Sequence, residues 1–125
     1  MKSSAPKEYL CLVHFEGSKL TEMTKSEKAQ LDRDSLAYDK VIKKSGHLIA
    51  AQALQSANKA RIVSVREGKT SVVDGPFTET KEQLGGFILI KAKNMGEAEK
   101  IAAGIPLAKL GRIEVRPIYT IPGSN

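Results

Sequence analysis

Residues 72–90 read VVDGPFTETKEQLGGFILI, and this stretch contains the end of one strand, an enforced bend and a second strand. Pro76 fixes its own φ angle and keeps Gly75 out of helical geometry, so the chain bends directly after the strand that carries Asp74. Residues 87–90 are apolar at every position, which is typical of a strand covered on both faces. The stretch therefore predicts two strands of one sheet, with a carboxylate at the rim between them.

The flanking sequence completes an α+β pattern. Thr24 and Glu27 have the spacing of a capping box, and Asn94 and Glu97 repeat that pattern before a second helical stripe. The expected elements are a strand at 9–15, a helix at 24–44, a strand at 47–54, a hairpin at 60–65 and 70–73 that extends the sheet, a strand at 87–90, a helix from 94 to 106 and a strand at 112–119. This order predicts a ferredoxin-like α+β fold with an antiparallel sheet and two main helices on one face.

The strands at 9–15 and 87–90 present apolar side chains on both faces, and two helices can cover only one of them. A chain of 125 residues has few other segments with which to cover the other face, and a second copy packed sheet to sheet would cover it. We therefore expect a homodimer with a cavity between the sheets, open to a small-molecule ligand whose identity the sequence does not specify.

Length and composition exclude several classes of protein. A chain of 125 residues with 41% hydrophobic and 27% charged residues is expected to form a single domain, residues 1–125, with a flexible N-terminus at 1–7. Residues 1–8 lack the apolar stretch of a secretory signal, and no apolar run reaches the length of a membrane span, so we expect a cytoplasmic protein without a membrane partner. The one cysteine, Cys11, lies in an apolar run and is expected to be a buried, inert thiol.

The net charge of +6 permits attraction to nucleic acids, but its distribution argues against it. The lysines are spread over nearly every segment, and three tyrosines and three phenylalanines, with no tryptophan, offer few stacking platforms. No dinucleotide or phosphate-binding glycine pattern is present, so we expect no cofactor. We also expect no metal site, because His14 with Glu16 or Asp74 would need a third ligand that the sequence does not indicate.

Residues 74–87, DGPFTETKEQLGGF, are similar almost letter for letter to the DGPF signature of the YCII-related family. The turn at 67–69 and the run at 114–117 look like further family landmarks. The resemblance implies a dimeric α+β barrel, related to muconolactone-isomerase-like and monooxygenase-like proteins, in a group whose members mostly have no assigned function. Some members are encoded beside, or fused to, extracytoplasmic-function sigma factors, which implies a regulatory association as an alternative to catalysis.

The resemblance also implies site residues within the motif. Asp74 stands in the matching motif as a candidate catalytic residue. For members nearer the founding type, the resemblance implies a His–Asp pair, formed by a histidine in the first helix and an acidic loop opposite it. Residues 24–44 of this chain contain no histidine, so that pair does not transfer. The candidate ligand-binding residues of the motif are Phe77, Glu79, Lys81, Gly85 and Gly86.

Asp74 has two interpretations from the residues alone. Its carboxylate could accept hydrogen bonds from the following amides in an Asx-turn that only organises the bend. Alternatively it faces the cavity as a general acid or base, with a pKa raised by apolar neighbours. The polar residues Glu79, Lys81 and Glu82 could orient a ligand or form a solvated turn, and Gly85 and Gly86 allow either close backbone approach or a bulge.

His14 and Glu16 are two apart on a strand and are expected to point to the same side, which makes them the best acid–base pair in the sequence and His14 a candidate catalytic residue. A hydrogen-bonded core histidine is the alternative. His47, just past a helix stop, is expected on the surface. Arg112 and Arg116 share the polar face of the last strand, where Arg116 in particular could hold an anionic substrate or could pair with Glu114 of a neighbouring chain.

The sequence thus leaves two functions open. The first is an isomerase-like enzyme that transfers protons with Asp74, supported by His14 and Arg116. The second is a non-catalytic ligand-binding or regulatory dimer in which Asp74 is a structural cap.

Overall fold

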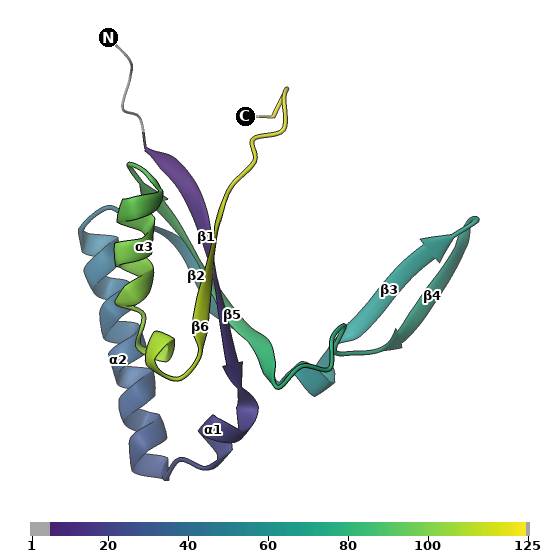
Figure 1. Cartoon of the computed structure of the whole chain (residues 1–125), viewed down its shortest axis with the longest axis horizontal. Helices are drawn as coiled ribbons and strands as arrows, with labels where there is room; N and C mark the ends of the chain where they lie inside the picture. Colours follow the sequence, from purple (N-terminus) through teal and green to yellow (C-terminus); the bar gives the residue numbers. More distant parts are fainter. Residues whose placement is uncertain (1–5, 125) are drawn as a thin grey trace.

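The protein, described here by a computed structural model for residues 6–124, is an α+β fold built on a four-stranded antiparallel sheet (Figure 1). The elements, in chain order, are β1 (Lys7–Glu16), α1 (Gly17–Thr21), α2 (Lys25–Lys44), β2 (Leu48–Ala53), the 3₁₀ turn η1 (Ala57–Lys59), β3 (Arg61–Arg66), β4 (Lys69–Asp74), β5 (Glu82–Ala92), α3 (Met95–Ala103), the 3₁₀ turn η2 (Pro106–Lys109) and β6 (Arg112–Pro117). The expected flexible N-terminus falls mainly on residues 1–5, which lie outside the described residues, and Lys7 is the first residue of β1.

The strand order β2-β5-β1-β6 confirms the ferredoxin-like prediction. β1 is central and pairs antiparallel with both β5 and β6, so Cys11 lies opposite Ile88 on one side and Val115 on the other. Each helix connects two strands that are separated by one intervening strand, which gives two split β-α-β units. The sheet within one chain is open and does not close into a barrel.

The helices α2 and α3 cover the same face of this sheet (Figure 1). The core lies between them and the alternate residues of the strands that point toward them, among which Cys11 and Ile90 are fully buried. The full burial of Cys11 confirms the prediction that it is a core residue, and this burial raises the pKa of its thiol to about 11. Tyr38 of α2 donates a hydrogen bond to the carbonyl of Ile101 and so joins the two helices.

Both predicted helix starts are confirmed. Thr24 Oγ1 accepts from the amide of Glu27 at 3.0 Å, while Glu27 Oε1 accepts from the amide of Thr24 at 2.9 Å, a complete capping box. Asn94 caps α3 in the same way through the amide of Glu97. At the other end of α2, Gly46 has φ +86°, the left-handed conformation expected of it.

The hairpin β3–β4 does not extend the main sheet, and the prediction that it would is wrong. Among the strands of residues 6–124, β3 and β4 pair only with each other and form a second, two-stranded sheet that projects away from the body as an arm (Figure 1). Its turn is tight, as expected, with Glu67 at φ +51° and Gly68 at φ +77°. The turn η1 before β3 and the strandless stretch 75–81 after β4 redirect the chain, so the arm leaves the plane of the main sheet.

The face of the main sheet opposite the helices, which we call the helix-free face, carries Leu10 and Leu12 of β1 and Phe87 and Leu89 of β5. These side chains are half-buried, and no described helix covers them. Within residues 6–124, none of the helices has both the length and the apolar character needed to cross a membrane.

Candidate functional site

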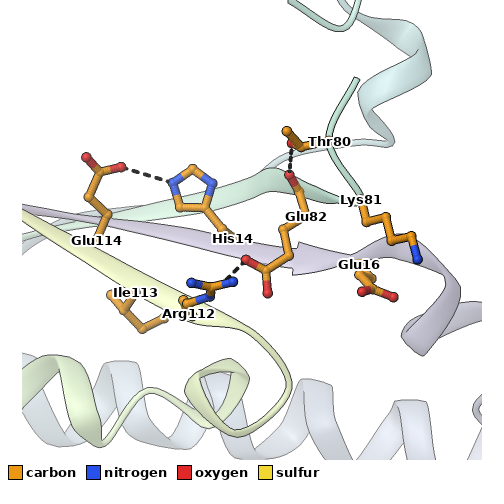
Figure 2. Close-up of a pocket in the computed structure, with 8 residues that line it drawn as sticks. All are labelled: His14, Glu16, Thr80, Lys81, Glu82, Arg112, Ile113 and Glu114. Atoms are coloured by element: carbon orange, nitrogen blue, oxygen red, sulfur yellow. Dashed lines mark hydrogen bonds and ion pairs between the residues drawn. The ribbon is translucent and has the colours of Figure 1, made fainter. Parts of the chain in front are cut away.

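A depression of about 680 Å³ lies on the helix-free face, where β1, β5 and β6 meet the loop that follows the arm. We call it the charged depression; its lining residues are His14, Glu16, Thr80, Lys81, Glu82, Arg112, Ile113 and Glu114. Figure 2 shows that His14 and Glu114 project away from the helices, whereas Ile113 points toward them. Strand alternation explains this difference, because neighbouring residues of β6 point to opposite faces of the sheet.

His14 and Glu114 form the closest acid–base pair of the charged depression. Nε2 of His14 lies 3.2 Å from Oε1 of Glu114, and the two side chains are 31% and 51% exposed (Figure 2). A carboxylate only accepts hydrogen bonds, so Nε2 carries the proton and donates it. When the imidazole is neutral, its Nδ1 therefore presents a lone pair that can accept a proton.

The register of the sheet brings this pair together. Arg112 lies opposite His14, and Glu114 lies opposite Leu12, so the glutamate is the diagonal neighbour of the histidine on the same face. The sequence prediction missed Glu114 as a partner of His14. Its only signal was the polar alternation of the last strand, which predicts a face but not the strand against which it pairs.

The floor of the depression is held by a second ion pair. Nε of Arg112 lies 3.2 Å from Oε1 of Glu82, and Thr80 Oγ1 donates to the carbonyl of Glu82 at 2.7 Å (Figure 2). These contacts tie the loop after the arm to β6. In the single chain the partner of Arg112 is Glu82, and the alternative that Arg112 or Arg116 pairs with Glu114 of a neighbouring chain stays a prediction.

Glu16 lines the same depression as His14, as the two-residue spacing predicted. Its carboxylate is nevertheless not the partner of the imidazole, because His14 turns toward Glu114. Lys81 also lines the depression, whereas Glu79 is an exposed residue of the loop outside its lining.

Asp74 lies at the base of the arm, where its carboxylate pairs with the guanidinium of Arg61 on the opposite strand. Its side chain is 81% exposed. The carboxylate thus accepts from Arg61 rather than from the following amides in an Asx-turn, which was one of its two interpretations from the sequence, and apolar neighbours do not enclose it within residues 6–124. Asp74 lies outside the lining of the charged depression, and a catalytic role for it stays a prediction.

Gly85 and Gly86 confirm both structural interpretations offered for them. β5 carries a bulge at this point, since Val13 pairs with Gly86 and His14 with Leu84. A Cβ at position 85 would collide with the ring of Phe15, and one at position 86 would lie 2.9 Å from the carbonyl oxygen of Gln52. Both glycines thus shape the strand beside His14, and their predicted ligand contacts stay predictions.

The other predicted residues are dispersed. Arg116 lies opposite Leu10, toward the far end of β6, and Phe77 is exposed in the loop after the arm. His47 is half-buried rather than a plain surface residue, because its Nε2 lies 3.6 Å from Oε1 of Glu97 and its Nδ1 lies 2.7 Å from Oγ of Ser45. Within residues 6–124, no cluster of three or more His, Cys, Asp or Glu side chains has the arrangement of a metal site.

Comparison of the sequence with known proteins identifies the family of this chain. The family model of the YCII-related domain matches residues 8–122. An uncharacterized protein of Rhizobium meliloti (strain 1021) is 34% identical to the chain over 112 residues, which cover 88% of this chain and 90% of that protein. The matched region includes all strands of the main sheet, the arm and the charged depression.

Proposed function

Because the chain belongs to the YCII-related family, we propose that it binds a small molecule on the helix-free face and transfers a proton with His14. The observation that carries this proposal is the hydrogen bond of His14 to Glu114 in the wall of the charged depression. His14 supplies a base with an oriented ring, and Glu114 supplies a carboxylate that stabilises the protonated ring. The depression supplies space for a reactant.

The chemistry follows from the tautomer. Nδ1 of His14 accepts a proton from the ligand, and Glu114, held at Nε2, stabilises the imidazolium that results. The guanidinium of Arg112 lies on the same face and uses its Nε for Glu82, so its two terminal amino groups remain for an oxygen atom that gains negative charge. The protonated His14 then returns the proton to the same or a conjugated carbon, which is an exchange or an isomerisation.

The test is proton exchange into small carbonyl compounds. Keto acids, unsaturated lactones and 1,3-dicarbonyl compounds are incubated with the protein in D₂O, and loss of the α-proton signal is followed by NMR. We expect exchange with at least one class, and we expect His14→Gln to slow it by about 10²- to 10⁴-fold, the usual contribution of a general base. Glu114→Gln should slow it less, since the base remains and the glutamine oxygen can still accept from Nε2, but the negative charge that stabilises the imidazolium is lost.

His47→Gln is the matched control, because His47 is likewise a histidine paired with a glutamate, at 3.6 Å, but away from the depression. It should exchange protons at the wild-type rate. If His14→Gln keeps the wild-type rate, the proposal is wrong. Asp74→Asn decides whether the motif aspartate takes part, and its exposed pair with Arg61 leads us to expect no change in rate.

A second candidate function is a non-catalytic ligand-binding or regulatory protein. The pairing of Asp74 with Arg61 favours it, because the acid of the motif then organises the base of the arm rather than a reaction. This function predicts that small molecules perturb NMR signals of the charged depression without any proton exchange.

A further inference from the structure

A second depression, of about 630 Å³, adjoins the charged depression and shares His14, Thr80 and Glu82 with it. We call it the apolar depression, because apolar side chains from the segment before the arm, the arm itself, the loop after it and β5 line it together with polar ones. The apolar side chains that matter here are Leu54, Ala57, Ile62, Pro76, Phe77 and Leu84. His14 therefore lies at the junction of a polar and an apolar compartment.

The apolar wall lacks a cover within the described chain. The sequence has three phenylalanines, and the side chain of one of them, Phe77, is 83% exposed. The side chains of Leu54 and Leu84 are exposed as well. Large apolar surfaces of this kind, concave and next to polar groups, are typical of ligand sites. An aromatic ring has few rotatable bonds, so ordering it against a ligand costs little conformational entropy.

Positively and negatively charged side chains are equal in number among the residues that line the two depressions. The lining residues of the two depressions include three cations, Lys59, Lys81 and Arg112, and three carboxylates, those of Glu16, Glu82 and Glu114. Two of these charges already pair with each other, Arg112 with Glu82. A ligand with a full charge would meet charges of both signs, whereas a neutral ligand with one polar group would not disturb this balance.

We propose that the apolar depression is the specificity subsite, and that the ligand is an uncharged carbonyl compound with an aromatic or branched aliphatic body. The body packs against Phe77, and the carbon next to the carbonyl lies at His14. This inference rests on the proposed function and names its substrate class.

The reaction balances without a co-reactant. The C–H bond next to the carbonyl breaks, its proton goes to Nδ1 of His14, and its electron pair forms the C=C bond of an enolate. The enolate oxygen, now negative, faces the guanidinium of Arg112. Return of the proton to carbon restores the neutral histidine, so nothing is oxidised or reduced.

The test uses three related probes: 4-phenylbutan-2-one, butan-2-one, which keeps the ketone but lacks the ring, and 3-phenylpropanoate, which keeps the ring but carries a charge in place of the ketone. Binding is measured by titration of amide NMR signals of the full chain. We expect the aryl ketone to shift the signals of Phe77, Leu84 and His14, and to bind more tightly than either other probe.

Phe77→Ala should weaken the aryl ketone by about three- to tenfold, the range of an aromatic contact, and leave butan-2-one unchanged. Tyr119→Ala is the matched control, since Tyr119 is 76% exposed but outside both linings, and it should change no affinity. A second variant, Ala57→Phe, adds a bulky side chain at another lining residue of the depression and should also exclude the aryl ketone.

The readouts separate the two proposals. If the aryl ketone leaves the signals of Phe77 and Leu84 unchanged, or binds Phe77→Ala and Ala57→Phe as it binds wild type, the subsite is overturned, even where His14→Gln abolishes exchange. If binding depends on Phe77 but His14→Gln exchanges at the wild-type rate, the subsite is supported as a binding site and the catalytic function is overturned.

Discussion

Gly85 lies against the ring of Phe15 at the bulge in β5 beside His14. A methyl group at this position would overlap the ring, so Gly85→Ala must displace either Phe15 or the strand. We expect a loss of about 1–3 kcal/mol in the free energy of unfolding, measured by urea denaturation. Phe15→Leu combined with Gly85→Ala should recover part of this loss relative to the sum of the single variants. An unchanged stability of Gly85→Ala would contradict this packing.

At the start of α3, the side chain of Glu97 binds the backbone that leads into the helix. Glu97 Oε1 accepts from the amide of Lys93 at 2.9 Å, and this backbone hydrogen bond, with the nearby charges of His47 and Lys93, lowers the pKa of Glu97 from its usual 4.5. A lowered folded-state pKa stabilises the fold above the unfolded-state value, and the effect is lost as the pH falls through the folded-state pKa.

Wild type should therefore melt at a higher temperature than Glu97→Gln at about pH 7, and the difference should disappear under acid conditions below the lowered pKa. Circular dichroism at several pH values measures this. Glu99→Gln, a change at an exposed glutamate of the same helix, is the control and should show no such pH-dependent difference. A difference between wild type and Glu97→Gln that is constant across pH would contradict the mechanism.

At the scale of the whole molecule, two further apolar surfaces have no cover from the described residues 6–124. One is the helix-free face with Leu12 and Phe87, and the other is the side of the arm that carries Val63, Val65 and Val72, all exposed. A two-stranded hairpin is marginally stable in water by itself. Both features support the proposal that a second copy packs on the helix-free face.

We expect light scattering to give twice the chain mass of 13.6 kDa. Leu12→Lys introduces a charge into the proposed interface and should shift the protein toward the monomer. The matched control is Leu36→Lys on the outer side of α2, where Leu36 is 64% exposed, and it should leave the mass unchanged. A wild-type protein that is monomeric at high micromolar concentration would contradict the dimer.

The sequence by itself determined the main strands and helices and their order, although it did not indicate the short helix α1 or the 3₁₀ turns η1 and η2. The capping box at Thr24, the N-cap at Asn94, the turn at Glu67 and the bend at Pro76 depend on residues a few positions apart, so their chemistry is visible without the fold. The alternation of β1 likewise predicted which residues share a face, and hence that His14 and Glu16 line one depression. The motif at 74–87 was sufficient to indicate the family, which the match over residues 8–122 shows.

Only the tertiary structure decided which partners meet. His14 and Glu114 are 100 positions apart, and their contact depends on the register between β1 and β6. The same holds for the departure of the arm from the main sheet and for the pairing of Asp74 with Arg61. Such contacts form only when whole strands and helices pack against one another. That packing depends on many side chains that are distant in the sequence, so no local pattern of residues encodes these contacts.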